Sequence, residues 1–256
     1  MKTPIITLLT DFGTKDTFVS VMKGVILSIC PKAQLIDLSH EVPPQSILTG
    51  AFLLKSSLEY FPKGTVHLAV VDPGVGSTRK AIALRSRGHF FVGPDNGLFS
   101  AALKEWGIDG AVELTEAKYH LPNPSSTFHG RDLFAPVAAH LAKGVAFASL
   151  GKKTNHWIWR EIPKPYQTPE GWAGEVLWVD RFGNLITNLE SKHIPQPFRL
   201  KAGKTVVLHL STHYAEAKRG TLTALLGSSG NLEISINRGN AAQKLGVGIG
   251  GSVLLY

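Results

Sequence analysis

The chain has 256 residues, of which 43% are hydrophobic and 18% charged, and it carries a formal net charge of +8 at neutral pH. This composition is typical of a globular protein with one large domain or two modest ones, and it excludes a disordered chain. The single cysteine, Cys30, excludes an internal disulfide framework and suits a reducing compartment, so we expect a cytoplasmic protein.

Charge and hydropathy also limit the partners to be expected. The basic residues are scattered, with no run longer than two, and no nucleic-acid-binding motif occurs. No stretch approaches the roughly 20 apolar residues of a membrane span, and the first residues are not typical of a signal peptide. We therefore expect a small-molecule partner, and neither a nucleic acid nor a membrane.

Up to residue 160, apolar β-type runs alternate with segments of helical periodicity. Strands are expected at residues 4–13, 33–39, 64–72, 80–86 and 89–97, and helices at residues 17–30, 45–61, 98–106 and 130–144. This alternation predicts a mostly parallel sheet with helices on both faces, in which ligands gather where strands end. Asp11, Asp72 and Asp95 each sit at the end of a strand, so we expect a site at that edge.

The pattern changes after residue 160. Three prolines, Pro163, Pro165 and Pro169, indicate a linker, and short β-type runs separated by glycine-bearing turns follow it. The expected runs are residues 174–180, 184–190, 204–210, 231–237 and 252–256. They predict a small antiparallel barrel or sandwich. The predicted fold class is therefore α/β, with an N-terminal α/β domain over residues 1–160 and a smaller, all-β, barrel-like domain over residues 171–256.

Two segments imitate known binding motifs. His209 and His213 have the i,i+4 spacing of a zinc pair, but the pattern places them on a strand and its exit loop, where that spacing does not bring ligands together. The glycine-rich segment 246–251 imitates a dinucleotide-binding loop, yet too few residues follow it for a βαβ unit. The sequence therefore predicts no metal ligands, and no cofactor is expected.

Four polar segments have no evident structural reason. Asp72 and Arg79 lie at either end of the glycine-hinged turn "VVDPGVGSTRK" (70–80), which by itself is equally typical of a solvated loop. His129 stands beside a glycine at the start of a helix in "STFHGRD", where a histidine is often only a cap. A carboxylate, an aromatic ring and amides, which suit a nucleoside-like ligand, surround the turn "DRFGNLITN" (180–188). Two serines and flexible glycines follow in "GSSGNLEISINRGNAA" (227–242).

Together, ordered motifs along the chain resemble those of the S-adenosyl-L-methionine hydroxide adenosyltransferases, relatives of the fluorinating and chlorinating enzymes. The resemblance covers essentially all 256 residues and is carried by "LLTDFGTKD", "VMKGVI", "DLSHEVPPQ", "HLAVVDPGVGSTRK", "FVGPDNGL", "STFHGRDLFAP", "DRFGNLITN" and "NRGNAA". It implies hydrolysis of S-adenosylmethionine by attack of water or hydroxide on C5′, giving adenosine and methionine. It also implies a homotrimer whose active sites lie where the N-terminal domain of one subunit meets the C-terminal domain of a neighbour.

The resemblance also implies which residues form the site. The catalytic Asp-Arg-His set of the family falls on Asp72, Arg79 and His129, and its ribose-binding aspartate falls on Asp11. Its methionine- and adenine-binding residues fall on Asp180, Phe182, Asn184, Ser228, Ser229 and Ala241. The C-terminal domain is therefore expected to complete the nucleoside site.

The catalytic set suits this chemistry because the sulfonium of the substrate is already a good leaving group, and only the nucleophile has to be supplied. Water has a pKa of about 15.7 and is a poor nucleophile, and Arg79 offers a fixed positive charge that favours hydroxide. Asp72 can orient Arg79 and accept a hydrogen bond from the water. His129, with a reference pKa of about 6.5, can take a proton near neutral pH. Which of the three residues is the formal base stays open.

Two alternatives stand beside hydrolysis. The first is halide transfer: by the same resemblance, the halogenating relatives lack this aspartate and histidine and have a tryptophan where Gln45 stands. Asp72 and His129 would impose polarity on a pocket that has to be dry for a halide. The second is a non-catalytic sensor of adenosine or S-adenosylmethionine, although binding alone would not require all three residues of the set.

Overall fold

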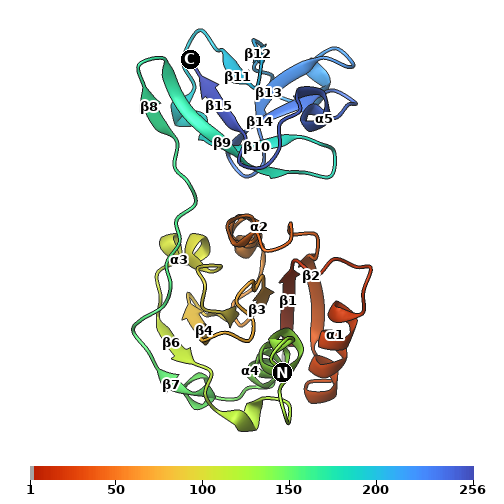
Figure 1. The fold of residues 1–256 in the computed structure, drawn as a ribbon, viewed down its shortest axis with the longest axis vertical. Helices are drawn as coiled ribbons and strands as arrows, with labels where there is room; N and C mark the ends of the chain where they lie inside the picture. The colour runs from red at the N-terminus through yellow and green to blue at the C-terminus, as the bar shows by residue number, and fades with distance from the viewer. Residues whose placement is uncertain (1–2) are drawn as a thin grey trace. The chain divides into compact units, whose positions relative to one another are not determined.

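The computed structural model describes residues 3–256, and the chain divides into two units, Met1–Ile162 and Pro163–Tyr256. We call them the N-terminal unit and the C-terminal unit (Figure 1). Each has hydrophobic core residues of its own. Within the described residues, no helix is both long and apolar enough to cross a membrane.

A seven-stranded sheet forms the centre of the N-terminal unit, in the order β2-β1-β3-β5-β4-β6-β7. Its strands are β1 (Ile5–Thr10), β2 (Gln34–Ser39), β3 (Val66–Val70), β4 (Ala81–Ser86), β5 (His89–Pro94), β6 (Gly110–Glu113) and β7 (Lys152–Lys153). The pairs among β2, β1, β3 and β5 are parallel, whereas β4, β6 and β7 extend the sheet in antiparallel pairs. The direction changes at the β4–β5 hairpin, where Arg87 (φ 48°) and Gly88 (φ 82°) adopt the left-handed conformations of a type I′ turn. The sheet is therefore mixed, with a parallel half and an antiparallel half, and not mostly parallel as predicted, because the tight hairpin after β4 returns the chain without a crossover helix.

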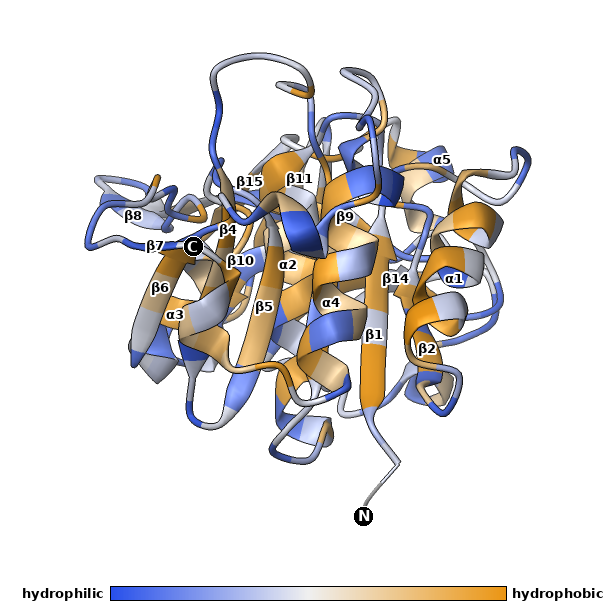
Figure 2. Ribbon diagram, turned by 90° about the horizontal axis from the view of Figure 1, so that it is seen from below, coloured by the Kyte–Doolittle hydropathy of each residue, from blue (hydrophilic) through white to orange (hydrophobic). Residues whose placement is uncertain are grey.

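Helices cover both faces of this sheet: α1 (Phe18–Ile29), α2 (Ile47–Ser57), α3 (Ser100–Trp106) and α4 (Ala135–Ala142). α1 and α4 pack over Ile6 and Leu8 of β1, while α2 and α3 lie on the other face with Leu9. β1 is therefore apolar on both faces, and it is mostly orange in Figure 2. Short 3₁₀ turns occur at Leu58–Tyr60, Ala117–Tyr119 and Phe147–Leu150, and a π-helical turn at Gly130–Phe134 leads directly into α4.

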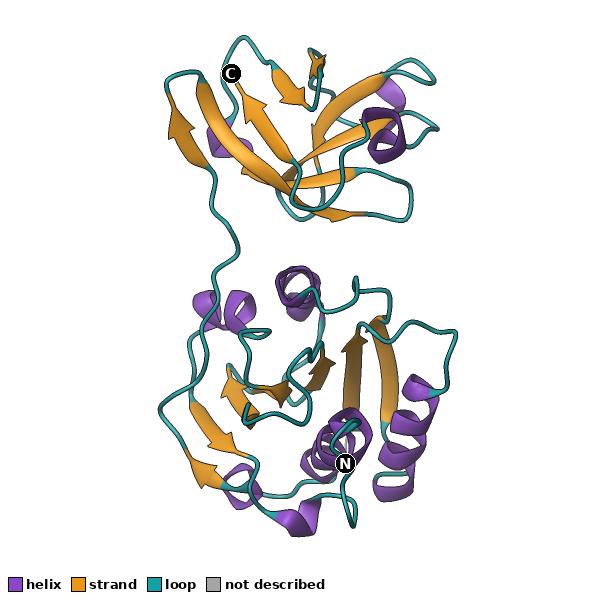
Figure 3. Cartoon of the chain, in the orientation of Figure 1, coloured by secondary structure: helices purple, strands orange, loops and turns teal. Residues whose placement is uncertain are grey.

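Antiparallel strands make up most of the C-terminal unit (Figure 3). They are β8 (Tyr166–Thr168), β9 (Gly171–Val179), β10 (Leu185–Glu190), β11 (Leu200–Ala202), β12 (Thr205–Val207), β13 (Leu222–Leu226), β14 (Asn231–Ile236) and β15 (Ser252–Leu255). The sheet order is β12-β11-β15-β9-β10-β14-β13, with β8 paired to β9, and the end strands β12 and β13 approach each other. A short helix, α5 (Ala241–Leu245), and 3₁₀ turns at Ser191–His193 and Tyr214–Glu216 complete the unit. The predicted fold class, α/β with a smaller barrel-like β part, is confirmed.

The parallel half of the N-terminal sheet brings three acidic residues to one edge. Asp11 directly follows β1, Asp95 directly follows β5, and Asp72 comes shortly after β3. Because β1, β3 and β5 are parallel neighbours, their carboxyl ends meet at the same edge of the sheet. The predicted placement of these carboxylates is confirmed.

Two buried histidines lie side by side across the same sheet. The Nδ1 of His67 on β3 lies 2.8 Å from the Oγ1 of Thr7 on β1, and its Nε2 lies 3.1 Å from the Nδ1 of His89 on β5. Burial lowers the pKa of His67 to about 3, with His89 adding to the shift, and burial also lowers the pKa of His89. Both rings are therefore neutral at neutral pH and serve as hydrogen-bonding parts of the core.

We predict that this histidine pair makes the fold sensitive to acid. An unfolded histidine has a pKa of about 6.5, so the buried neutral ring contributes its full stability above that pH. The contribution is lost as the pH falls toward the folded-state pKa of about 3. His67→Gln, which cannot be protonated, should be less stable than the wild type at alkaline pH but should lose less stability on acidification.

Urea denaturation midpoints measured from mildly alkaline pH down to about pH 4 check this expectation. The exposed His156 provides the control substitution, His156→Gln, which should follow the wild type. Equal acid sensitivity of the wild type and His67→Gln would contradict the prediction.

Candidate active site

A glycine-hinged turn, residues 71–80, leads from β3 to β4 and carries two of the predicted site residues. Its chain reverses through a hydrogen bond of 3.1 Å from the Ser77 N–H to the Gly74 carbonyl. The Ser77 hydroxyl donates to that carbonyl at 2.6 Å and accepts from the Arg79 N–H at 3.2 Å. These local bonds bend the turn so that Arg79 faces Asp72.

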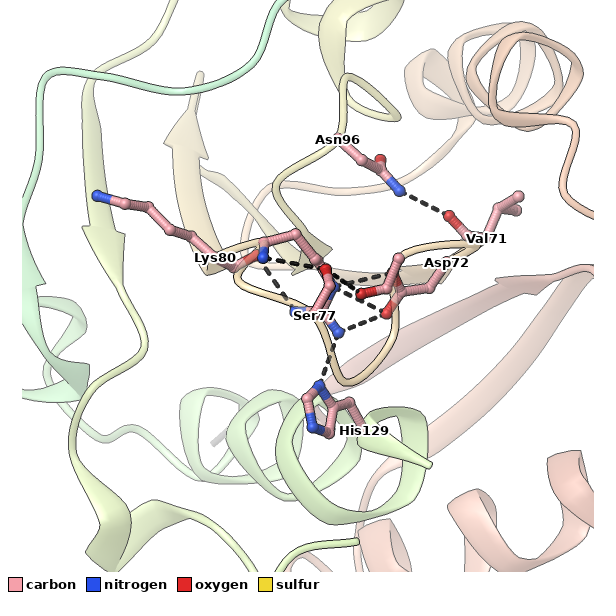
Figure 4. A network of polar contacts seen from close by, with 8 residues as sticks. Val71, Asp72, Ser77, Lys80, Asn96 and His129 are labelled. Carbon is pink, nitrogen blue, oxygen red and sulfur yellow. Dashed lines mark hydrogen bonds and ion pairs between the residues drawn. The ribbon is translucent and has the colours of Figure 1, made fainter. Parts of the chain in front are cut away.

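Asp72 and Arg79 form a two-pronged ion pair (Figure 4). The Nε of Arg79 lies 2.9 Å from Oδ1 and 3.0 Å from Oδ2 of Asp72, and its Nη2 also donates to Oδ2. The side chain of Arg79 is only 9% exposed and that of Asp72 only 5%, and the guanidinium lies 5.2 Å from the centre of the Phe134 ring. The alternative that this is a pair on a solvated loop is therefore wrong.

His129 joins this pair as an acceptor. The Nη2 of Arg79 lies 2.7 Å from His129 Nδ1, and because a guanidinium can only donate, Nδ1 must be unprotonated. Burial lowers the pKa of His129, and the charge of Arg79 lowers it further, against the opposing effect of Asp72 and Asp132. At neutral pH, His129 is therefore a neutral ring that carries its proton on Nε2.

The donors of Arg79 are almost completely used. A guanidinium has five N–H groups, and here Nε and Nη2 serve Asp72 and His129, while Nη1 donates to the Lys80 carbonyl at 3.3 Å. Within residues 3–256, one Nη1 hydrogen of Arg79 and the Nε2–H of His129 have no acceptor. These are the donors that the set can offer to an oxygen of a ligand.

The segment around His129 is held by a buried carboxylate. His129 directly precedes the π-helical turn Gly130–Phe134, a rare conformation that is frequent at functional sites. Asp132 in this turn is 2% exposed; it accepts from the Ser125 N–H at 2.8 Å and pairs with Arg131 at 2.6 Å. The loop before His129 is thereby tied to the helical turn after it.

A close approach of two backbones sets the spacing between the 71–80 turn and this loop. Gly76 has φ 76°, and a Cβ at this position would lie 2.4 Å from the carbonyl oxygen of Ser126. Only glycine fits both this conformation and this contact. The loop that carries His129 can therefore approach Arg79 closely enough for their hydrogen bond.

Asp11 lies at the same edge of the N-terminal unit. Its Oδ2 accepts a hydrogen bond of 2.8 Å from the N–H of Gln45, which has φ 66°. Among the described residues, its Oδ1 has no hydrogen-bond donor. The rings of Phe12 and Phe128, 5.9 Å apart, link the segment after Asp11 to the segment before His129.

The turn after β5 contains Asp95, whose carboxylate stabilises the fold, and Asn96, which the sequence did not predict as a site residue. Asp95 is 6% exposed, and its Oδ1 accepts from the N–H of Ile158 at 2.7 Å, so it holds the chain rather than offering a free carboxylate. Asn96, which was not among the predicted site residues, donates from Nδ2 to the carbonyl of Val71, next to Asp72, at 2.8 Å. Its position in "PDNG", at the end of a strand beside β3, was the available signal.

The other predicted residues lie in the C-terminal unit. In the turn between β9 and β10, the Asp180 carboxylate accepts from the N–H groups of Phe182 and Asn184 and from Asn184 Nδ2, at 2.8–2.9 Å. Asn184 is 5% exposed, whereas the Phe182 ring is 75% exposed. Ala241 is buried at the start of α5, whose second residue donates from its N–H to the Gly183 carbonyl at 2.9 Å. Asp180, Phe182, Asn184 and Ala241 are therefore brought together.

Ser228 and Ser229 are exposed on the turn between β13 and β14. The preceding Gly227 leaves room for the Glu233 carboxylate, which accepts from the hydroxyl of Tyr214 at 2.8 Å. Burial raises the pKa of Glu233, and the charge of Asp180 adds to the shift, so the two turns are within electrostatic reach.

Within residues 3–256, no group of three or more His, Cys, Asp or Glu side chains is arranged to hold a metal ion.

We predict that the pKa of His129 shifts in opposite directions in two variants. Arg79→Gln removes a positive charge and should raise this pKa, whereas Asp72→Asn removes a negative charge and should lower it. In the wild type, His129 should titrate below the usual value of about 6.5, with the neutral ring protonated on Nε2. Nitrogen NMR of the histidine rings across pH measures both properties, with exposed His156 as internal reference. Shifts in the same direction would contradict this electrostatic account.

Comparison with known proteins places the chain in one family. The model for the SAM hydroxide adenosyltransferase N-terminal domain matches residues 6–151, and that for the C-terminal domain matches residues 174–254. The chain is 41% identical to (R)-S-adenosyl-L-methionine hydrolase of Salinispora arenicola, over 96% of the chain and 95% of that protein. It is 29% identical to the fluorinase of Actinopolyspora mzabensis, over 93% and 92%. A crystal structure of an uncharacterized conserved protein from Thermotoga maritima is similar, with a TM-score of 0.91 and 36% identity over 98% of this chain and 99% of that one. With both of its domains matched in order, the chain belongs to the SAM hydroxide adenosyltransferase family.

Proposed function

We propose that the protein hydrolyses S-adenosyl-L-methionine to adenosine and L-methionine. The observation that carries this proposal is the buried set of Asp72, Arg79 and His129 at the carboxyl edge of the N-terminal sheet. Relatives named (R)-S-adenosyl-L-methionine hydrolase, such as those of Salinispora arenicola (41% identical) and Methanocaldococcus jannaschii (38% identical), support it.

In the proposed reaction, the oxygen of water or hydroxide forms a bond to C5′ while the bond between C5′ and the sulfonium sulfur breaks. The electron pair of the broken bond goes to sulfur, so methionine leaves as a neutral thioether. One proton is released for each molecule of water consumed. Because the leaving group needs no acid, the task of the protein is to prepare and position the oxygen, and oriented groups can reach effective molarities of about 10⁵–10⁸ M.

We assign the three residues of the set different roles in preparing this oxygen. The free Nη1–H of Arg79 and the Nε2–H of His129 would donate to it and favour hydroxide over water. Because Arg79 occupies Nδ1 of His129, we assign His129 as a donor and not as the formal base, a role that the sequence left open among the three residues. Asp72 balances the charge of Arg79, so that the empty site does not bury an unpaired charge. The proton lost from water would pass to the solvent.

We propose that the substrate is held by residues of the N-terminal unit of one subunit and of the C-terminal unit of a neighbouring subunit. The unpartnered Oδ1 of Asp11 suits the hydroxyl groups of a ribose, and the exposed ring of Phe182 offers a stacking face. We propose that the adenine and methionine ends are bound by Asp180, Phe182, Asn184, Ser228, Ser229 and Ala241. We further propose a homotrimer with active sites at subunit interfaces, as the family resemblance implies. From the single cysteine and the lack of metal and cofactor motifs in the sequence, we propose that it is cytoplasmic and works without cofactor or metal.

Product analysis tests the proposed function directly. Purified protein incubated with S-adenosyl-L-methionine should release adenosine and methionine in equal amounts, at the same rate with and without a chelator. Formation of 5′-halo-adenosine in fluoride or chloride buffer, with no adenosine, would replace hydrolysis by halide transfer. Calorimetric binding of S-adenosyl-L-methionine with no product would instead identify a sensor.

Substitutions of Asp72, Arg79 and His129 should show that the three residues act together. Asp72→Ala, Arg79→Ala and His129→Ala should each lower kcat about 10²- to 10³-fold, the range for loss of one preorganised donor, with a much smaller change in substrate affinity. Combining two of them should cost little more than one. Arg79→Lys, which keeps the charge but loses the planar fork, should also be strongly impaired.

Steady-state kinetics and binding calorimetry on these variants provide the measurement. The control is Lys55→Ala, which breaks the exposed ion pair between Lys55 on α2 and Glu105 on α3 and should keep wild-type turnover. Near-normal turnover of Asp72→Ala and Arg79→Ala would remove the set from the reaction.

A further inference from the structure

The turn after β5 contacts both ends of the 71–80 turn. Asn96 Nδ2 donates to the carbonyl of Val71, directly before Asp72, at 2.8 Å, and the N–H of Asp95 donates to the carbonyl of Lys80, directly after Arg79, at 2.9 Å (Figure 4 shows the first contact). The Lys80 carbonyl also accepts from Arg79 Nη1. One tight turn therefore holds the main chain on either side of the Asp72–Arg79 pair.

Asn96 makes this contact where the strand ladder has ended. Paired residues of β3 and β5 run only as far as Leu68 and Val92, and the next residue, Gly93, packs so tightly that a Cβ would lie 2.2 Å from the Ala69 carbonyl. Beyond this point, the amide of Asn96 replaces a main-chain donor of β5. The Val71 carbonyl is thereby tied to β5 at the position where the chain leaves the sheet.

The orientation of the Asn96 amide is fixed by its own turn. Its Oδ1 accepts from the N–H of Leu98 at 3.2 Å, which leaves Nδ2 as the atom that faces Val71. An amide turned the other way would set two acceptor oxygens against each other at Val71. Asn96 is therefore a donor of fixed direction.

A segment that we call the strap, residues 157–160, holds the Asn96 turn from outside. Arg160 donates from Nε to the Asn96 carbonyl and from its N–H to Ser100 Oγ, both at 2.9 Å. Its side chain lies where a Cβ on Gly97 would come within 2.5 Å. The N–H of Ile158 donates to the Asp95 carboxylate. The strap thus stabilises the position of the Asn96 turn by hydrogen bonds and packing.

We propose that Asn96 is a positioning residue for the reaction at Asp72, Arg79 and His129, and that the strap keeps it in position. By holding the Val71 carbonyl, Asn96 prevents rotation of the peptide between Val71 and Asp72. This fixes the direction of the Asp72 side chain, which aims Arg79 at His129. The inference rests on the proposed function for its kinetic consequence and on geometry alone for its effect on His129.

The kinetic test compares Asn96→Ala with a matched control. Thr168→Ala also removes one side-chain bond to a carbonyl, that of Gly171, and one from an N–H, that of Glu170, but in the C-terminal unit. Asn96→Ala should lower kcat by about 10- to 100-fold with little change in KM, because small misplacements cost this much. Thr168→Ala should keep kcat. Asn96→Asp, which keeps the acceptor for Leu98 but cannot donate to Val71, should resemble Asn96→Ala and serves if the latter does not fold.

Two readouts separate positioning from a general loss of stability. In an Arg79→Lys background, Asn96→Ala should cost little further turnover, whereas a structural effect would add to it. Independently of any activity, the pKa of His129 should rise toward its usual value in both Asn96 variants, because Arg79 would no longer be held against it.

The outcomes distinguish this inference from the proposed function. No adenosine from the wild type would overturn hydrolysis, while the His129 titration would still decide the geometric inference. Wild-type kcat together with an unchanged His129 titration in Asn96→Ala or Asn96→Asp would overturn the role of Asn96 and leave hydrolysis intact. Equal losses of kcat in Asn96→Ala and Thr168→Ala would likewise overturn it.

Discussion

Taking a carboxylate and a guanidinium out of water costs several kcal/mol per ion, and Asp72 and Arg79 offset this cost by their geometry. Two prongs join them, the Phe134 ring lies against the guanidinium, and the Lys80 carbonyl takes one further N–H. Much of the local structure exists to keep these contacts in place. Gly76 allows the His129 loop to approach, Asp132 ties that loop down, and Asn96 holds the chain before Asp72.

The mixed sheet makes this pair possible. β3 and β5 are parallel and end at the same edge, whereas β4 runs antiparallel to β5 and therefore begins at that edge. Asp72 follows β3 and Arg79 precedes β4, so a short turn crossing the end of β5 brings them together. Had β4 been parallel to its neighbour, its start would lie a full strand away, or about 20 Å at some 3.3 Å per residue. The hairpin turn at Arg87 and Gly88 thus has a direct consequence for the site.

The electrostatics of the set favour water over a halide as the entering nucleophile. Arg79 is neutralised by Asp72, and His129 is uncharged, so the site as a whole offers no net positive charge to a halide. A halide would have to lose its hydration shell and pass a fixed carboxylate, which is costly in a buried site. In the proposed reaction, water would approach as a neutral molecule and would gain negative charge only after binding to the two free donors.

The first four helices, the first five strands and the position of Asp11, Asp72 and Asp95 at strand ends could be predicted from the sequence, because they follow from local hydrophobic periodicity. The short strands β6, β7, β8, β11 and β13 and the antiparallel half of the N-terminal sheet were not predicted. The identity of the catalytic candidates could also be predicted, because their motifs occur in family order along the chain. What the sequence could not decide was pairing over long distances. Arg79 and His129 are 50 residues apart, and their contact depends on strand order and on the close approach at Gly76.

Burial and hydrogen-bond direction likewise belong to the tertiary structure. The pattern "VVDPGVGSTRK" suits a solvated loop as well as a buried pair, and only the packing of Phe134 and the His129 loop removes the pair from water. The tautomer of His129 follows from which group faces Nδ1, which no local pattern encodes. Asn96 was missed for the same reason. Its proposed role depends on a hydrogen bond to the carbonyl of Val71, which lies 25 residues earlier, directly after β3. Sequence alone determined which residue types were available at the edge of the sheet, whereas the three-dimensional packing decided which of them meet, because contacts between distant segments are made by the fold and not by local periodicity.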